Sequence, residues 1–155
     1  MRIVIDPGIW NDTWESQDKL FSIANNLYDK LYNRGHEVLM TRSEASEEAD
    51  AGASQGDLFI GLYAAPDPNN SEGESSFFCR LASNARGEEV RKDICKRMAE
   101  LPGIARINIY PLSVAELTAV PAAVVMLQFC FSFGSSSVTP AILAETIGSC
   151  IADNL

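Results

Sequence analysis

Short apolar runs alternate along this chain with longer segments in which apolar residues recur every three or four positions. The clearest long segment covers residues 17–34, and its period of about 3.6 residues predicts an amphipathic helix that ends at Gly35. The apolar face of this helix consists of Leu20, Ile23, Ala24, Leu27 and Leu31. Apolar runs predict buried strands at residues 2–5, 57–63 and 121–131. A further strand is predicted at residues 36–40.

Weaker patterns occupy the middle of the chain. Residues 84–99 predict a charged amphipathic helix with Val90, Ile94 and Met98 facing inward. Short strands are predicted at residues 76–79 and 107–110, and loops at residues 43–56 and 66–75.

The last segment begins with Thr139 and Pro140, which suit the N-cap and the first position of a helix that runs to about Asp153. Strands and helices therefore alternate along the chain. This order predicts a single α/β domain over residues 1–155, with a mostly parallel or mixed central sheet flanked by helices in three layers.

Ligands of open α/β sheets bind outside the carboxyl ends of the strands, which are here residues 6–8, 63–65 and 126–128. The turn at residues 6–8 is of a kind that delivers a catalytic or metal-binding side chain, yet the next residue is the aliphatic Ile9. Asp6 is interpreted either as a cap for the amides of this turn or as a remaining ligand. Arg42 either pairs with an acidic neighbour or faces the same cleft.

The 155 residues carry a net charge of -9, which argues against nucleic acid and anionic membrane surfaces as partners. The longest apolar run, residues 120–133, contains Gln128 and is too short to span a bilayer. The chain shows no signal-peptide pattern, so its localisation stays open. A cytoplasmic protein and an excised domain of an exported cell-wall protein would both have this sequence.

Cysteine and histidine give little support for a metal site. Cys79, Cys95, Cys130 and Cys150 are widely spaced, form no CxxC pair and are expected to be buried thiols. The one histidine, His36, is expected at the surface.

Five segments, in the same order, resemble the N-acetylmuramoyl-L-alanine amidases of the LytC and AmiC type, the Amidase_3 family. IVIDPG resembles the family opening IVIDPGHGG, and IANNLYDKLYNRGHEVLMTR resembles its first helix and second strand. DLFIGLYAAPDPN resembles DLFISIHANAAPN, and VPAAVVMLQFCFS resembles MPAVLVELGFLSN. AILAETIGSCIADNL resembles the closing helix of the family.

The resemblance implies a zinc-dependent hydrolase of the amide between the muramyl lactyl group and L-alanine of peptidoglycan. In that family two histidines and a glutamate hold the zinc, and a second glutamate is the general base. By position, the histidines fall on Ile9 and Tyr63, the ligand glutamate on Ser16 and the general base on Met126. Glu15, next to Ser16, is the one residual ligand candidate.

A site without these residues implies a catalytically degenerate amidase, a pseudoenzyme with no metal cofactor, which binds a cell-wall fragment or a protein partner. One alternative is an active amidase whose atypical zinc site uses Glu15, Asp12, Asp6 or Tyr63. Another is a structural domain that oligomerises, since the sequence leaves the oligomeric state open.

The candidate cleft residues are expected to lie together at the carboxyl edge of the sheet. They are Asp6, Ile9, Trp10, Trp14, Glu15, Tyr63, Met126 and Gln128. Within this set Trp10, Trp14 and Tyr63 either stack on sugar rings or cover the hydrophobic layer.

Overall fold

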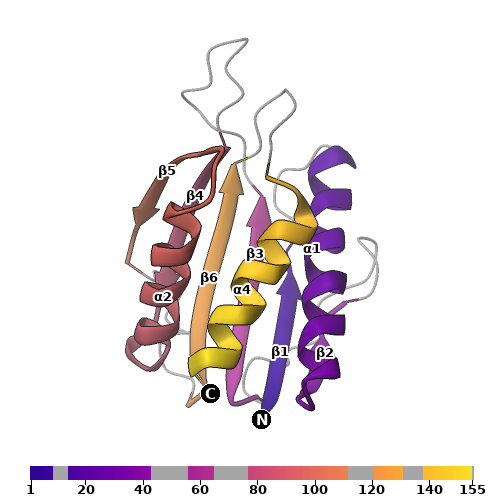
Figure 1. Cartoon of the computed structure of the whole chain (residues 1–155). Helices are drawn as coiled ribbons and strands as arrows, with labels where there is room; N and C mark the ends of the chain where they lie inside the picture. Colours follow the sequence, from indigo (N-terminus) through magenta and orange to yellow (C-terminus); the bar gives the residue numbers. More distant parts are fainter. Residues whose placement is uncertain (9–13, 43–55, 65–76, 112–120, 131–137, 155) are drawn as a thin grey trace.

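A six-stranded mixed sheet forms the centre of the molecule in the computed structural model (Figure 1). The structure describes residues 1–8, 14–42, 56–64, 77–111, 121–130 and 138–154. The strands are β1 (Arg2–Pro7), β2 (Glu37–Met40), β3 (Leu58–Ala64), β4 (Phe77–Ser83), β5 (Ile104–Ile109) and β6 (Ala123–Cys130). They lie in the order β2-β1-β3-β6-β4-β5.

Two strands run against the other four. β1 pairs in parallel with β2 and β3, and β3 pairs in parallel with β6. β4 is antiparallel to β6 and parallel to β5. The carboxyl ends of β1, β3 and β6 therefore share one edge of the sheet, and β4 and β5 end at the opposite edge.

Three described helices cover one face of this sheet (Figure 1). They are α1 (Trp14–Asn33), α2 (Glu88–Ala99) and α4 (Pro140–Asn154), and a 3-10 turn, η2 (Ala85–Gly87), leads into α2. Their apolar residues form the main core with the facing side chains of the strands, among them Ile3, Ile60, Leu81 and Leu127. The predicted inward positions of α2, Val90, Ile94 and Met98, are buried in this core.

The helix ends follow the predicted signals. The backbone N–H of His36 donates to the carbonyl of Leu31, and Gly35 between them has a φ of 88°, which closes α1 in a Schellman-type turn. The Thr139 hydroxyl accepts a hydrogen bond of 3.2 Å from the N–H of Ile142 and so caps α4.

The opposite face of the sheet carries a smaller apolar cluster. Its buried members are Val4, Phe59, Ala82, Val124 and Met126, and the partly buried Tyr63 and Tyr110 pack against it. Successive residues of a strand point to opposite faces of the sheet. Residues of β3 and β6 belong to both clusters, so both faces of these strands are buried. This explains why their sequences are apolar without alternation.

The predicted α/β fold around a mixed sheet is confirmed, whereas the described helices cover one face of the sheet and form no layer on the other. Several predicted boundaries change. α1 begins at Trp14, three residues earlier than its apolar period, because polar residues fill its first turn. β4 continues to Ser83, and β5 begins at Ile104. β6 lies within the predicted range 121–131 and ends at Cys130, so Met126 is in the middle of this strand and not at the carboxyl end that was expected at residues 126–128.

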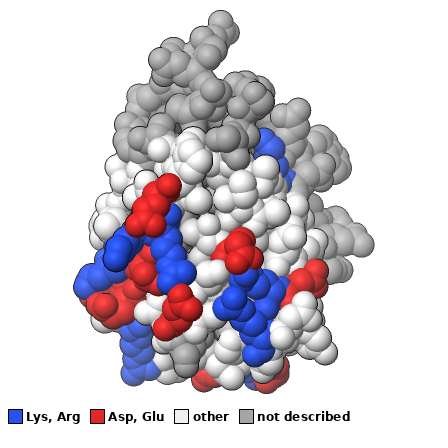
Figure 2. All heavy atoms as spheres, in the orientation of Figure 1, with Lys and Arg blue, Asp and Glu red and all other residues white. Residues whose placement is uncertain are grey.

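Charged side chains of both signs are interspersed over the helices (Figure 2). On α2, Lys92 pairs with Glu88 and Glu89. Lys30 on α1 pairs with Glu145 on α4. Within the described part of the chain, no helix combines the length and the apolar character that crossing a bilayer requires.

Candidate functional site

Asp6, Tyr63 and Met126 come together on the face of the sheet that is opposite the helices. The register pairs Asp6 of β1 with Gly61 of β3, and Gly61 with Met126 of β6. Tyr63 follows Gly61 by two residues and so points to the same face. The structure therefore brings together these three candidate residues from three parallel strands.

Two glycines leave the space that the ring of Tyr63 occupies. A Cβ atom at Gly8 would lie 2.0 Å from Cε1 of this ring. A Cβ atom at Gly61 would lie 2.8 Å from its Cε2 and 2.6 Å from Sδ of Met126. The Tyr63 ring thus lies against the backbone of both glycines, with the Met126 thioether beside it.

The Asp6 carboxylate binds the hydroxyl of Tyr63. It is 9% exposed and accepts hydrogen bonds from the Thr41 hydroxyl and, at 3.1 Å, from the Tyr63 hydroxyl. Nη2 of Arg42 lies 3.8 Å from Oδ1 of Asp6. Asp6 is itself a candidate cleft residue, so this contact agrees with both interpretations of Arg42, as the partner of an acidic residue and as a residue that faces the cleft. The possible cap on the amides of residues 9–13 lies outside the described residues.

The environment of Tyr63 keeps its phenol protonated. Burial raises the pKa of Tyr63 strongly, and the negative charge and hydrogen bond of Asp6 raise it further, whereas Arg42 opposes this change. At neutral pH the hydroxyl is therefore a hydrogen-bond donor to Asp6 and not a phenolate.

A row of polar side chains continues from Tyr63 across the same face. Tyr63 of β3 is in register with Gln128 of β6, Gln128 with Arg80 of β4, and Arg80 with Asn108 of β5. Gln128 is partly exposed, and Arg80 and Asn108 are exposed. The sequence analysis identified Gln128 but missed Arg80 and Asn108, because only the antiparallel pairing of β4 brings them beside it.

For the other candidate site residues, the structure describes either the backbone alone or nothing. Trp14, Glu15 and Ser16 are in the first turn of α1, and their side chains are not among the described ones. Ile9, Trp10 and Asp12 lie outside the described residues. The sequence analysis also missed Thr41, whose signal was its place at the end of β2, the strand beside β1.

The described side chains do not fit a zinc site. Among the residues that the structure describes, no three His, Cys, Asp or Glu side chains gather in a way that could hold a metal ion. The hydroxyl of Tyr63 keeps its proton, and the side chain of Met126 is a thioether. Asp6 is the one carboxylate in this group, and Thr41, Tyr63 and Arg42 already surround it.

Cys79 and Cys150 are buried as predicted, whereas Cys95 is only partly buried, and neither Cys95 nor Cys150 forms a disulfide. Burial raises the pKa of the Cys150 thiol to about 12, and Asp93 adds to this effect. Burial also raises the pKa of Cys95, against an opposing effect of Arg91. Since the thiolate is the nucleophile, Cys95 and Cys150 are poor candidates for covalent chemistry.

Comparisons with known proteins identify the fold. AmiC2 of Nostoc punctiforme, an N-acetylmuramoyl-L-alanine amidase, superposes with a TM-score of 0.81 at 13% identity, over 99% of this chain and 96% of that one. The catalytic domain of the amidase CwlV from Bacillus (Paenibacillus) polymyxa gives a TM-score of 0.72 at 17% identity, over 99% and 97% of the two chains. The amidase CwlD from Clostridioides difficile, in complex with the GerS lipoprotein, gives 0.74 at 12% identity over 98% and 96%.

The chain therefore has the fold of the N-acetylmuramoyl-L-alanine amidases over nearly its whole length. No family model matches its sequence. No curated protein matches it by sequence either. The likeness concerns the fold, and function has to be argued from the site.

Proposed function

We propose that this chain is a catalytically inactive protein of the amidase fold that acts by binding a peptidoglycan fragment. The observation that carries this proposal is the packing of Tyr63 against Gly8, Gly61 and Met126, with the Tyr63 hydroxyl on Asp6. By the resemblance, Tyr63 and Met126 stand where the amidases have a zinc ligand and the general base.

Amide hydrolysis by zinc needs N or O ligands, an open coordination position for water and a carboxylate that takes a proton from that water. A protonated phenol is a poor zinc ligand, and a thioether cannot act as a base at neutral pH. Met126 is 6% exposed, so an apolar side chain also suits this position better than an unpaired carboxylate would. These replacements favour a stable fold without the metal.

The polar row beside Tyr63 supports binding of a sugar-peptide ligand. The amide of Gln128, the guanidinium of Arg80 and the amide of Asn108 follow one another across three strands on one face. Amide and guanidinium groups hydrogen-bond the hydroxyls, amides and carboxylates of a muropeptide. The similarity to AmiC2, an N-acetylmuramoyl-L-alanine amidase by name, favours this class of ligand.

A protein partner is a second candidate. The CwlD amidase, which shares this fold, is described in complex with the GerS lipoprotein. An amidase-fold domain can thus bind another protein, and an inactive one would keep that capacity.

Zinc content and hydrolysis test the loss of catalysis. The protein is purified without chelator, incubated with excess zinc, passed through a desalting column and measured by elemental analysis, with the CwlV catalytic domain as the positive control. We expect negligible zinc in this chain and no release of peptides from peptidoglycan. A stoichiometry close to one zinc per chain, as in a single catalytic site, would contradict the proposal.

Binding of a muropeptide is measured separately by calorimetry on the same preparation. We expect Gln128→Ala and Arg80→Ala to weaken binding by roughly tenfold each, as for one lost polar contact. His36→Ala is the control, because His36 lies just before β2 at the opposite end of the sheet. Equal affinities in all variants would exclude this row as the binding surface.

A further inference from the structure

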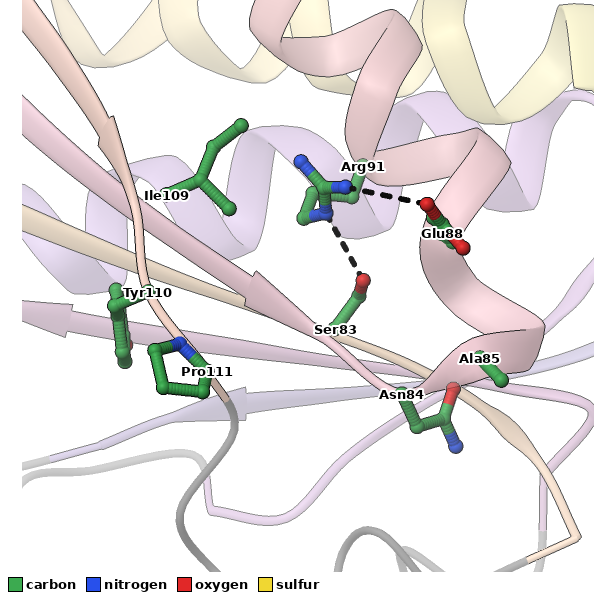
Figure 3. Close-up of a pocket in the computed structure, with 8 residues that line it drawn as sticks. All are labelled: Ser83, Asn84, Ala85, Glu88, Arg91, Ile109, Tyr110 and Pro111. Atoms are coloured by element: carbon green, nitrogen blue, oxygen red, sulfur yellow. Dashed lines mark hydrogen bonds and ion pairs between the residues drawn. The ribbon is translucent and has the colours of Figure 1, made fainter.

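A pocket lies at the other end of the sheet, where β4 and β5 end (Figure 3). It has a volume of about 350 Å³, within the range of about 300–1,000 Å³ typical of small-molecule sites. Ser83, Glu88 and Arg91 line one side, and Ile109, Tyr110 and Pro111 line the other. The pocket thus has a polar wall and a largely apolar wall.

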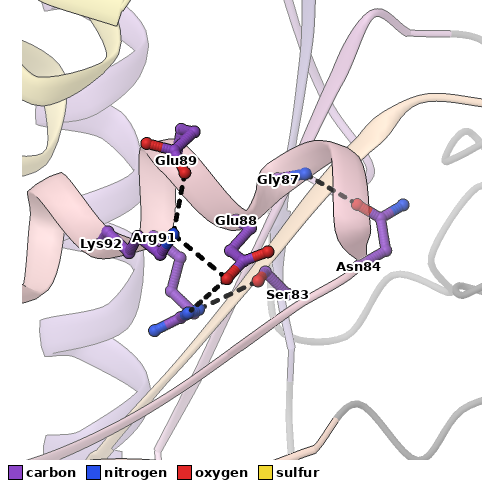
Figure 4. A network of polar contacts seen from close by, with 7 residues as sticks. All are labelled: Ser83, Asn84, Gly87, Glu88, Glu89, Arg91 and Lys92. Atoms are coloured by element: carbon purple, nitrogen blue, oxygen red, sulfur yellow. Dashed lines mark hydrogen bonds and ion pairs between the residues drawn. The ribbon is translucent and has the colours of Figure 1, made fainter.

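The polar wall is held in place by Asn84 (Figure 4). Its Oδ1 accepts hydrogen bonds from the N–H groups of Gly87, at 2.9 Å, and Val124, at 3.0 Å, and its amide nitrogen donates to the carbonyl of Ala122. A Cβ atom at Gly87 would lie 2.2 Å from the carbonyl oxygen of Val124, so the turn lies directly on β6. The start of α2 is therefore fixed against the sheet.

Arg91 brings an incompletely satisfied cation to this wall. The residue is 8% exposed, and its Nε donates to the Ser83 hydroxyl at 3.0 Å. Its Nη2 lies 3.9 Å from Oε1 of Glu88, beyond hydrogen-bond distance. Its Nη1 is buried and has no acceptor among the described residues. The Arg91 side chain lines the pocket and forms few hydrogen bonds with the described residues, so its guanidinium keeps donor capacity for a ligand oxygen.

Glu88 and the charge of the whole chain limit which ligand fits. The Glu88 side chain is 48% exposed, and its Oε1 lies 3.9 Å from Nη2 of Arg91 and 3.2 Å from Nζ of Lys92, so a ligand at Arg91 meets a carboxylate that disfavours a simple anion. The chain has a net charge of -9, which further disfavours free anions. A ligand that carries a carboxylate and an ammonium group has no net charge and matches both Arg91 and Glu88.

We propose that this pocket binds a small zwitterion of the amino-acid type. The carboxylate accepts hydrogen bonds from the Arg91 guanidinium, the ammonium group lies on the Glu88 carboxylate, and the side chain packs against Ile109, Tyr110 and Pro111. This proposal is independent of the proposed function, because the pocket lies at the sheet edge opposite the carboxyl ends of β1, β3 and β6.

The proposal is tested by titrating three matched small molecules into the isotope-labelled protein and recording NMR spectra. Alanine carries both charged groups, propionate lacks the ammonium group and ethylamine lacks the carboxylate. We expect alanine to cause saturable shifts in the amide signals of Glu88, Arg91 and Tyr110 and in the Nε–H signal of Arg91. Propionate and ethylamine should bind at least about tenfold more weakly, since each loses one charge-assisted contact.

Variants on α2 complete the test. Arg91→Gln and Glu88→Gln should each weaken alanine binding about tenfold or more. Lys96→Gln, an exposed basic residue on the same helix outside the pocket lining, should leave it unchanged. Glu88→Gln removes a half-exposed charge and keeps the test valid if Arg91→Gln does not fold. The proposal is overturned if alanine causes no saturable shift, if propionate binds as well as alanine, or if folded Arg91→Gln and Glu88→Gln keep full affinity.

Discussion

At the scale of single residues, Tyr63 determines the chemistry available beside Asp6 and Met126. Its ring fits only because Gly8 and Gly61 have no side chains, and its hydroxyl donates a hydrogen bond to the Asp6 carboxylate. Each of these residues alone has an ordinary role in a strand or a turn. Together they make the place of the expected metal ligand a packed group in which the phenol of Tyr63 keeps its proton.

Replacing Tyr63 by phenylalanine tests the hydrogen bond to Asp6. The ring packing is kept, but the buried carboxylate loses one donor, so we expect a loss of about 1–2 kcal/mol in the free energy of unfolding. Urea denaturation at neutral pH measures this. Tyr28→Phe is the matched control, because Tyr28 stacks on Tyr32 and its hydroxyl bonds to no described residue. A change equal to that of the control would show that the bond to Asp6 is not stabilising.

The stability difference between the native chain and Tyr63→Phe is expected to depend on pH. Burial raises the pKa of Tyr63 in the folded state, whereas an unfolded tyrosine ionises near pH 10. Above about pH 10 the unfolded chain loses a proton that the folded chain keeps, so rising pH destabilises the fold. We expect the native chain to lose stability between about pH 9 and pH 11 more steeply than Tyr63→Phe. The pKa of Tyr110 is also raised by burial, but Tyr110 is present in both proteins. Parallel curves would contradict this prediction.

At the scale of secondary-structure elements, the sequence predicts strands and helices best where local signals agree. The structure contains the two helices that these signals predicted. The apolar period and Gly35 predicted α1, and Thr139 with Pro140 predicted the start of α4. β4 was predicted too short, because its length depends on pairing with β5 and β6 rather than on its own pattern. Its reversed direction also could not be predicted from local sequence.

Asn84 joins three elements and is expected to be important for their packing. Replacing it by alanine leaves the backbone groups of Gly87, Val124 and Ala122 without partners, and we expect a loss of about 2–4 kcal/mol in stability. Asn84→Asp keeps both acceptor roles, and in acidic buffer, where its carboxyl is protonated and can again donate to the carbonyl of Ala122, it should lose less than Asn84→Ala. Thermal or urea unfolding of the three proteins measures the difference. Equal losses for both variants would contradict the role given to the accepted bonds.

The ion pair between Lys30 and Glu145 connects α1 to α4. The hydrogen bond from Lys30 lowers the pKa of Glu145, so the pair stabilises the fold above the ordinary glutamate pKa and is lost as pH falls through the lowered value. Glu145 is largely exposed, and we expect Glu145→Gln to cost about 0.5 kcal/mol at pH 7. This difference should disappear between about pH 5 and pH 3 in urea titrations. Glu100→Gln, an exposed carboxylate without an ion pair to any described residue, is the control.

At the scale of the whole molecule, the sequence resemblance predicted the fold, and the sequence placed Tyr63 near the end of β3, whereas Met126, expected at the carboxyl end of its strand, lies in the middle of β6. The structural neighbours share only 12–17% identity with this chain, yet the buried strands and helices superpose on theirs. The pattern could not show that the Tyr63 ring lies on two glycines, nor that Thr41 and Arg42 face Asp6. Those contacts depend on distances across the sheet, which a local pattern does not contain.

Installing the family residues tests whether the amidase fold keeps the geometry of a metal site. The variant carries Ile9→His, Ser16→Glu, Tyr63→His and Met126→Glu. We expect it to be less stable than the native chain without metal, because Met126→Glu places a carboxylate at a position that is 6% exposed.

Zinc should reverse this loss, since a metal that binds only the folded state stabilises it by about 2.7 kcal/mol at a hundredfold excess over its dissociation constant. Thermal unfolding with and without zinc, together with elemental analysis, measures the effect. The matched control keeps Tyr63 and carries the other three changes, and it should take up less zinc because the phenol still occupies the site. If the fourfold variant folds but takes up no more zinc than this control, the positions taken from the resemblance do not converge on a metal ion. The fold would then have lost the arrangement of the site as well as its residues.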